Sequence, residues 1–291
     1  MSKIAIIGSG VVGQATGKGL IAKGHDVVFC DINPDTLAKL KNEGHCVCLP
    51  DSLAREEVEA FFLTVSTPTV DGKIELNFLK SAVANLGGGL KERTDAYCLI
   101  VVRSTVPPGT TEDVLIPILE KYSGKKAGKD FGVCMNPEYL REVSNEEDFK
   151  NPWILTIGEL DCRSGEMLEE ICNHSSCPIV HVSLKEAEIQ KYAHNLFNAC
   201  KISFFNEMRM VCEAINVDAD KVFELVEKSA EASWNPKYGI RDFGPYGGSC
   251  LPKDTTAFSA WARDELKNPM PLLKAIIKVN ETIKEKYNGL K

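Results

Sequence analysis

The sequence has no apolar run long enough to cross a membrane and no cluster of lysine and arginine residues. It carries 34 basic and 41 acidic side chains, which give a net charge of -7. A membrane-spanning helix needs about 20 mostly apolar residues, and a nucleic-acid-binding surface needs concentrated positive charge. An apolar strand pattern begins at Ile4, which is too early for a signal peptide. We therefore expect a cytoplasmic protein that binds neither nucleic acid nor a membrane.

The cysteines and histidines also lack the spacings that bind zinc. Among 11 cysteines and 5 histidines there is no C-x-x-C pair and no histidine pair at ligand spacing. The odd number of scattered cysteines is not typical of a disulfide framework. We expect reduced thiols and no metal site in a globular chain of one large or two ordinary domains.

The first apolar run, Lys3–Ile7, predicts a buried strand, and the pattern of a dinucleotide-binding unit follows it. Gly8, Gly10 and Gly13 form G-x-G-x-x-G, and a helical pattern then leads to a second strand, Asp26–Cys30, which is followed directly by Asp31. In such a unit the glycines allow a tight turn, a close approach of a pyrophosphate and close packing of helix on strand. Asp31 would accept hydrogen bonds from the ribose hydroxyls and repel a 2′-phosphate. This pattern favours NAD over NADP.

Alternating strands and helices then continue to about residue 183. Further strands are predicted at 60–65, 97–102, 131–135, 153–157 and 179–182, with helices at 33–44, 76–86 and 164–173 and a glycine break at 87–89. This alternation predicts a Rossmann-type, doubly wound parallel sheet over residues 1–183. Polar clusters containing Thr67, Thr105 and Glu138 follow three of these strands, so we expect them beside the glycine loop at one sheet edge.

The character of the sequence changes at Ser183, which forms a capping box with Glu186. No glycine or proline interrupts the next thirty or so residues, which predicts a long spine helix. Lys191 and Asn195 are four residues apart and therefore lie on one side of it. They are either a surface pair or a cation and an amide directed into a cleft. Helices at 219–232, 255–266 and 271–287 complete an all-helical second domain, residues 184–291.

The stretch Gly247-Gly248-Ser249-Cys250-Leu251-Pro252-Lys253-Asp254 presents a thiol after two glycines. The glycines permit a turn that side chains would block, and the Lys253 charge favours the reactive thiolate. Cys250 is then a nucleophile that attacks a carbonyl carbon. The alternative is a buried, inert cysteine in a glycine-rich loop.

Taken together, these motifs resemble the UDP-glucose/GDP-mannose dehydrogenase family, and most closely its members that oxidise UDP-glucose. The resemblance rests on the glycine loop with Asp31 and on four further stretches in the same order, 104–107, 136–142, 191–195 and 247–254. It implies NAD-dependent, four-electron oxidation of the primary alcohol of a nucleotide sugar to a carboxylate, through a thioester on Cys250. It also implies a homodimer formed through the long helix. Family members usually continue with a third, nucleotide-binding domain, and this sequence stops before it, at Lys291.

The resemblance also implies roles for individual residues. The implied catalytic residues are Cys250, Lys191, Asn195, Asp254, Glu138 and Thr105. The implied NAD contacts, besides the three glycines, are Val11, Val12, Asp31, Thr67, Thr105, Glu142 and Lys253. The implied substrate contacts are Glu138, Tyr139, Leu140, Arg141, Glu142, Lys191, Asn195, Tyr238 and Gly247.

Two other functions are compatible with the same motifs. A two-electron β-hydroxyacid-type dehydrogenase would share the NAD fold and a helix lysine and asparagine, but it would need no thiol. A non-catalytic NAD-binding dimer, or a fragment without its substrate domain, would bind NAD and turn over no nucleotide sugar.

Overall fold

The computed structural model describes residues 1–55, 57–71, 73–93, 97–140, 149, 151–172, 177–236, 238–239, 245–248 and 250–288. The chain divides into two compact units, Met1–His194 and Asn195–Lys291. This division falls after the eleventh residue of the long helix, because the first turns of that helix pack on the first unit. The domain boundary that we placed at residue 183 stays a prediction.

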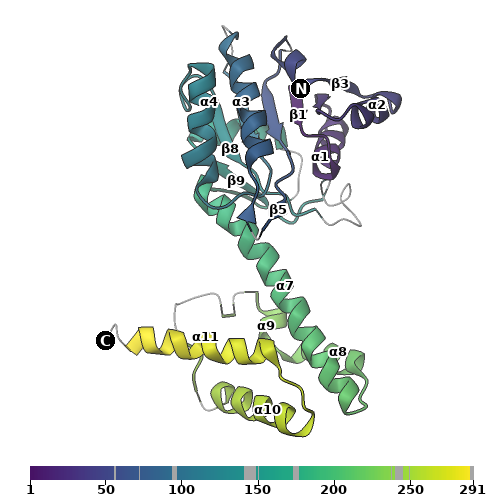
Figure 1. Ribbon diagram of the computed structural model, residues 1–291, viewed down its shortest axis with the longest axis vertical. Coiled ribbons are helices and arrows are strands. Elements are labelled where there is room, and N and C mark those ends of the chain that lie inside the picture. Colours follow the sequence, from purple (N-terminus) through teal and green to yellow (C-terminus); the bar gives the residue numbers. More distant parts are fainter. Residues whose placement is uncertain are drawn as a thin grey trace. The chain divides into compact units, whose positions relative to one another are not determined.

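An eight-stranded sheet forms the centre of the first unit (Figure 1). Its strands are β1 (Lys3–Ile7), β2 (Asp26–Cys30), β3 (Cys46–Cys48), β4 (Ala60–Leu63), β7 (Leu99–Val102), β8 (Gly132–Met135), β9 (Leu155–Glu159) and β10 (Ile179–Ser183). Their order across the sheet is β10-β9-β8-β7-β4-β1-β2-β3. A separate hairpin of β5 (Thr69–Val70) and β6 (Lys73–Ile74) follows β4. The short β3 and this hairpin were not predicted.

The predicted Rossmann-type sheet is confirmed, with one difference in strand direction. The six strands β3, β2, β1, β4, β7 and β8 run parallel to one another. Strand β9 pairs antiparallel with β8, and β10 runs parallel to β9. The loops after β1, β4, β7 and β8 therefore meet at one edge of the sheet, as the sequence predicted.

Helices cover both faces of the sheet, and the alternate side chains of each strand point to opposite faces. One face packs on α3 (Asn77–Lys91), on α4 (Ile116–Ser123) and on the start of α7 (Leu184–Ala214). The other face packs on α1 (Val11–Ala22), α2 (Pro34–Asn42) and α6 (Cys162–Cys172). Two further short helices are η1 (Pro50–Arg55) and η2 (Thr111–Leu115), which leads directly into α4. The sheet is thus doubly wound.

The glycine break expected at 87–89 was wrong, because α3 continues through it to Lys91. A Cβ atom added to Gly87 would lie 2.9 Å from the Cβ of Tyr122 and 3.3 Å from the carbonyl oxygen of Leu119. Both contacts belong to α4. Gly87 therefore allows two helices to approach closely, which is a packing role rather than a turn.

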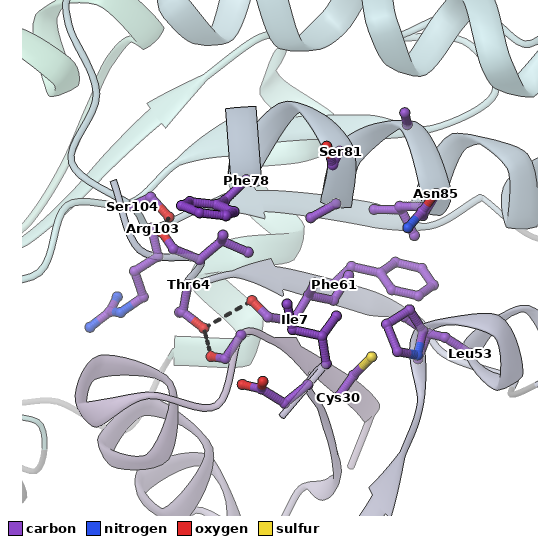
Figure 2. Close-up of a pocket in the computed structure, with 18 of the residues that line it drawn as sticks. Ile7, Cys30, Leu53, Phe61, Thr64, Phe78, Ser81, Asn85, Arg103 and Ser104 are labelled. Carbon is purple, nitrogen blue, oxygen red and sulfur yellow. Dashed lines mark hydrogen bonds between the residues drawn. The ribbon is translucent and has the colours of Figure 1, made fainter. Parts of the chain in front are cut away.

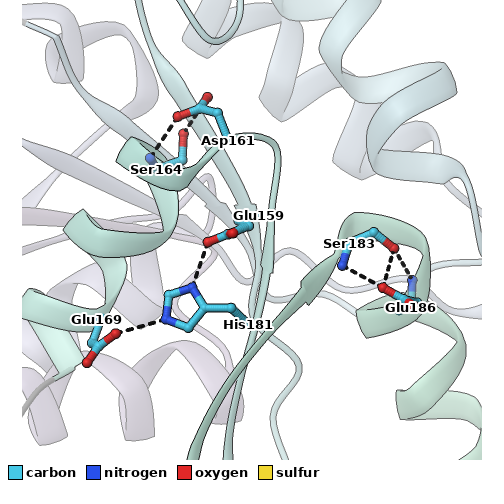
Figure 3. Close-up of polar contacts among 7 residues, drawn as sticks. All are labelled: Glu159, Asp161, Ser164, Glu169, His181, Ser183 and Glu186. Atoms are coloured by element: carbon cyan, nitrogen blue, oxygen red, sulfur yellow. Dashed lines mark hydrogen bonds and ion pairs between the residues drawn. The ribbon is translucent and has the colours of Figure 1, made fainter.

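The 31-residue helix α7 begins at the predicted capping box (Figure 3). The Glu186 carboxylate accepts hydrogen bonds from the backbone N–H and the hydroxyl of Ser183, each at 2.7 Å. In return, the Ser183 hydroxyl accepts one from the backbone N–H of Glu186 at 3.3 Å. These bonds satisfy backbone groups that a helix start leaves without partners, and they fix where α7 begins.

The second unit consists of the rest of α7 with α8 (Ala219–Ser229), α9 (Glu231–Trp234), α10 (Leu251–Glu265) and α11 (Pro271–Asn288). Its small core contains Val211, Ala262 and Met270. Glu207 of α7 accepts hydrogen bonds from the backbone N–H groups of Leu272 (2.9 Å) and Leu273 (3.1 Å). This carboxylate therefore caps the first turn of α11.

Candidate active site

A cavity of about 1120 Å³ follows the edge where the four polar loops meet (Figure 2). Of the residues expected at a cofactor or catalytic site, those that line it are Gly8, Gly10, Val11, Val12, Asp31, Thr67, Thr105 and Glu138. Apolar side chains, among them Leu53, Phe61 and Phe78, line it as well. The sheet edge thus presents a large space with polar loops and apolar walls, which is the usual character of a ligand pocket.

The glycine loop has the tight geometry that its spacing predicts. Gly8 has φ of +94°, a conformation that glycine adopts without steric cost. A Cβ atom added to Gly13 would lie 2.0 Å from the carbonyl oxygen of Gly8, so only glycine allows α1 to pack here. The Thr64 hydroxyl donates a hydrogen bond to the same oxygen at 2.5 Å (Figure 2). This role of Thr64 was not predicted from the sequence, because Thr64 belongs to none of the motifs that are identified by residue spacing.

The start of α1 is suited to hold the pyrophosphate of a dinucleotide. None of the described side chains caps this helix start, and there is no acid in its first turn. A Cβ atom on Gly10 would meet no protein atom within 4 Å, so the cavity reaches the backbone at this point. Exposed N–H groups and the helix dipole favour an anion there.

Asp31 is held in place at the rim of the same cavity. Its two carboxylate oxygens accept hydrogen bonds from the backbone N–H groups of Ser9 (2.6 Å) and Asn33 (2.8 Å). The carboxylate lies after β2, where Rossmann folds bind a ribose. The residues of this cavity therefore fit NAD.

Hydrogen bonds join the polar loops to one another. Thr67 donates through its hydroxyl to the carbonyl oxygen of Thr105 at 2.8 Å, and Ser104 donates to the carbonyl oxygen of Val65 at 2.6 Å. Arg103 donates to the side-chain oxygen of Asn136, and burial lowers the pKa of the guanidinium. These bonds connect the loops after β4, β7 and β8 into one rigid edge.

The buried cation Lys191 lies next to this edge. Its Nζ donates to the carbonyl oxygen of Glu138 and lies 2.9 Å from Oε1 of the same residue. The other carboxylate oxygen of Glu138 accepts from the backbone N–H of Leu140 at 2.7 Å. Burial and the Lys191 charge lower the pKa of His194, one turn further along α7. The predicted lysine and glutamate are thus in direct contact, and the glutamate lines the cavity.

Tyr139 and Leu140, expected at the substrate site, line a smaller cavity of about 40 Å³ instead. The Tyr139 hydroxyl lies 3.0 Å from the hydroxyl of Thr156 and also hydrogen-bonds to Gln190. Burial raises the pKa of this phenol. The predicted site residues Arg141 and Glu142 lie outside the described residues.

The remaining predicted site residues belong to the second unit. Cys250 is exposed and immediately precedes α10, which begins at Leu251 rather than at Thr255 as expected. Lys253 and Asp254 therefore lie in the first turn of a helix, where they pair with each other in exposed positions. Gly248 has φ of +78°, consistent with a turn before Cys250. The side chain of Asn195, four residues after Lys191 on α7, is exposed, as are Tyr238 and Gly247.

All eleven cysteines are among the described residues, and none of them forms a disulfide. No group of three or more histidine, cysteine or acidic side chains in the described ranges is placed to bind a metal ion. Among the helices of the described chain, none has the length and apolar character needed to cross a membrane.

Two family models together match most of the chain. Residues 49–176 match the NAD-binding domain of the UDP-glucose/GDP-mannose dehydrogenase family, and residues 185–282 match its central domain. GDP-mannose 6-dehydrogenase from Pseudomonas aeruginosa is 33% identical over 96% of this chain and 68% of that protein. The chain belongs to this family. As a UDP-glucose/GDP-mannose dehydrogenase family member, it is an NAD-dependent oxidoreductase that acts on a CH–OH group.

Other relatives carry names for two different substrates. UDP-glucose 6-dehydrogenase AglM from Haloferax volcanii is 36% identical over 96% of this family member and 69% of that protein. The solved structure of GDP-mannose dehydrogenase from P. aeruginosa has a TM-score of 0.90 at 32% identity, covering 96% of this chain and 68% of that one. A UDP-glucose dehydrogenase structure from Pyrobaculum islandicum has a TM-score of 0.73 at 32% identity, and the match covers 97% of this chain and 68% of that one. Residues 3–77 also match a model for coenzyme F420-dependent NADP oxidoreductases.

Proposed function

We propose that this chain oxidises the C6 primary alcohol of a nucleotide sugar to a carboxylate in two NAD-dependent steps, through a thioester on Cys250. The observation that carries this proposal is the buried Lys191 cation, which is hydrogen-bonded to Glu138 where that residue lines the cofactor cavity. A cation held in a low-dielectric position stabilises negative charge that develops on a reacting oxygen.

In the first half of the proposed reaction an alcohol becomes an aldehyde. NAD, when bound, would supply the hydride acceptor, and Asp254 or a bound water accepts the alcohol proton. Asp31 would hold a ribose of the cofactor, and the N–H groups at the start of α1 would hold its pyrophosphate. The rigid loops carrying Thr67 and Thr105 keep the edge of the cavity fixed during this step.

In the second half the thiolate of Cys250 attacks the aldehyde carbon and forms a thiohemiacetal. Lys191 and Asn195 stabilise its oxyanion, and loss of a second hydride gives the thioester. Water positioned by Glu138, Thr105 and Asp254 then hydrolyses the thioester and releases the carboxylate and the thiol. One alcohol, two NAD and one water thus give one carboxylate, two NADH and three protons.

The substrate class that we propose is a nucleoside diphosphate hexose, for which UDP-glucose was the expectation from sequence. GDP-mannose is a second candidate, favoured because several similar relatives at 33–37% identity are named GDP-mannose 6-dehydrogenases. Since the UDP-glucose relatives are 33% and 36% identical, sequence identity alone does not favour UDP-glucose over GDP-mannose or the reverse.

The test is the yield of NADH per molecule of sugar, with UDP-glucose, GDP-mannose and UDP-N-acetylsugars supplied in parallel. Two NADH for one of these sugars, abolished in Cys250→Ala and retained in Cys200→Ser, is the expected result. Cys200 is an exposed thiol on α7 and serves as the matched control. One NADH per sugar, unchanged in Cys250→Ala, would favour the two-electron alternative. NAD binding without NADH from any of these sugars would contradict the proposal.

We also propose that the chain forms a homodimer through α7. Large apolar side chains on this helix are exposed, including Leu196 (64%), Phe197 (67%) and Ile202 (62%). An extended exposed apolar surface is typical of a protein interface. Light scattering coupled to size exclusion should give twice the mass of the chain, and Phe197→Lys should shift the mass toward the monomer. A monomeric wild-type chain at micromolar concentration would rule out a stable dimer.

A further inference from the structure

Glu188, in the second turn of α7, is a fully buried carboxylate that contacts another helix. Its Oε2 accepts a hydrogen bond from the backbone N–H of Gly109 at 2.5 Å, and its Oε1 accepts one from Thr111 at 2.7 Å. These two donors lie where η2 begins, and η2 has no capping side chain of its own. Glu188 therefore caps the η2–α4 helix from outside.

The segment that Glu188 holds is the loop that carries Thr105 into the cofactor cavity. Gly109 has φ of +91°, and the hydroxyl of Thr110 donates to the carbonyl oxygen of Pro107 at 2.6 Å. At the other end of the loop, the carbonyl oxygen of Thr105 accepts a hydrogen bond from the hydroxyl of Thr67. The loop is thus fixed at both ends, and Glu188 fixes the end near α4.

Glu188 precedes Lys191 by three residues, which places the two side chains on neighbouring turns of one helix face. One turn of α7 therefore binds the Thr105 loop through Glu188, and the next binds Glu138 through Lys191. An ion pair in the same region, that of Lys185 with Glu112 (3.1 Å) and Asp113 (3.6 Å), is about half exposed. Such surface pairs contribute little to stability, so the buried carboxylate of Glu188 determines how α7 packs against the Thr105 loop.

We propose that Glu188 is a positioning residue that sets the place of Lys191 relative to Thr105 and the cofactor cavity. The inference deepens the proposed function and rests on it for its kinetic consequence. Two backbone donors require two acceptor oxygens, which a carboxylate supplies and an amide does not. In Glu188→Gln one N–H would face the amide NH₂, and α7 would shift away from the loop.

The experiment compares Glu188→Gln with Lys185→Ala, which removes only the exposed ion pairs of the same helix region. A misplacement of about 1 Å can cost on the order of 100-fold in rate, so kcat of Glu188→Gln should fall by about tenfold or more. The Kd for NAD should stay within about twofold of wild type, because Glu188 does not line the cofactor cavity. Lys185→Ala should retain the wild-type kcat. Equal losses in kcat and NAD affinity, or a kcat for Glu188→Gln equal to that of the control, would overturn the proposal.

A second measurement is independent of turnover. Acetylation of Lys191, followed by mass spectrometry, should be faster in Glu188→Gln than in wild type or Lys185→Ala, since the lysine is only 5% exposed in the intact structure. If wild type reduces no NAD, the proposed function fails, and this rate alone then supports or overturns the positioning role. If Glu188→Gln does not fold, Glu188→Asp, which keeps the charge but is too short to reach both donors, is measured in its place. Unchanged acetylation in the folded variant would overturn the proposal.

Discussion

Lys191 Nζ lies 2.9 Å from Glu138 Oε1, and the two side chains are only 7% and 13% exposed. This pair links the long helix to the loop after β8, beside the cofactor cavity. Removing one member of such a pair leaves the other charge buried without compensation, and this costs about 3–5 kcal/mol in measured cases. The two residues are therefore expected to depend on each other for stability as well as for chemistry.

Lys191→Ala should lower both the free energy of unfolding and kcat, while the Kd for NAD stays close to wild type. Lys191 does not line the cofactor cavity, so cofactor affinity does not depend on it directly. In denaturant unfolding, the double variant with Glu138→Ala should lose less stability than the sum of the two single variants. Additive losses would show that the two charges are energetically independent. A drop in NAD affinity as large as the drop in kcat would mean that Lys191 belongs to the cofactor site.

The glycine loop offers a matched pair of substitutions that separate folding from binding. Gly13→Ala should destabilise the fold, because its Cβ would lie 2.0 Å from the carbonyl oxygen of Gly8. Gly10→Ala should leave the melting temperature near wild type and weaken NAD binding, because its Cβ would enter the cavity without touching protein. Calorimetric unfolding and NAD titration measure the two effects. Wild-type NAD affinity in Gly10→Ala would contradict the assignment of the pyrophosphate to this turn.

Cys250→Ser should bind NAD normally but stop before steady formation of the acid, because a hydroxyl is a weaker nucleophile than a thiolate and its ester is hydrolysed less readily. The measurement is NADH formed in the first turnover and at steady state. Cys200→Ser, also an exposed thiol, should behave like wild type. Normal steady turnover to the carboxylate in Cys250→Ser would exclude the thioester.

His181 lies between the carboxylates of Glu159 and Glu169 (Figure 3). Its ring nitrogens lie 2.6 Å from Glu159 and 2.8 Å from Glu169, and these hydrogen bonds raise the pKa of His181 above its ordinary value of 6.5. Because the folded-state pKa is raised, the stabilisation is fully present below the unfolded pKa. It is lost as pH rises through the folded pKa.

Relative to His181→Asn, wild type should therefore have its largest advantage in melting temperature near pH 6, and this advantage should shrink as pH rises above 6.5. Glu169→Gln should reduce the advantage by replacing one of the two negatively charged hydrogen-bond acceptors with a neutral amide. A difference that is flat, or that grows with pH, would show that the histidine does not bind its proton more tightly in the folded state.

Much of the first unit could be predicted from the sequence, because its elements carry local signals. The apolar runs of β1 and β2 gave their bounds without error, and Ser183 with Glu186 marked the start of α7. The short strand Cys46–Cys48 was missed because three residues hold too little periodicity to identify a strand. The start of α10 was also missed, for a different reason: the glycines before Cys250 obscured a helix that begins at Leu251.

By itself the sequence determined the family motifs, the dinucleotide loop and the sheet class, because these depend on residue types at fixed short spacings. Only the tertiary structure decided that Gly87 packs α3 on α4, that β9 and β10 run opposite to the other strands, and that Glu188 caps η2. Each of these depends on a contact between segments far apart along the chain. Such a contact has no local periodicity to mark it, since its energy arises only when the sheet brings the two segments together.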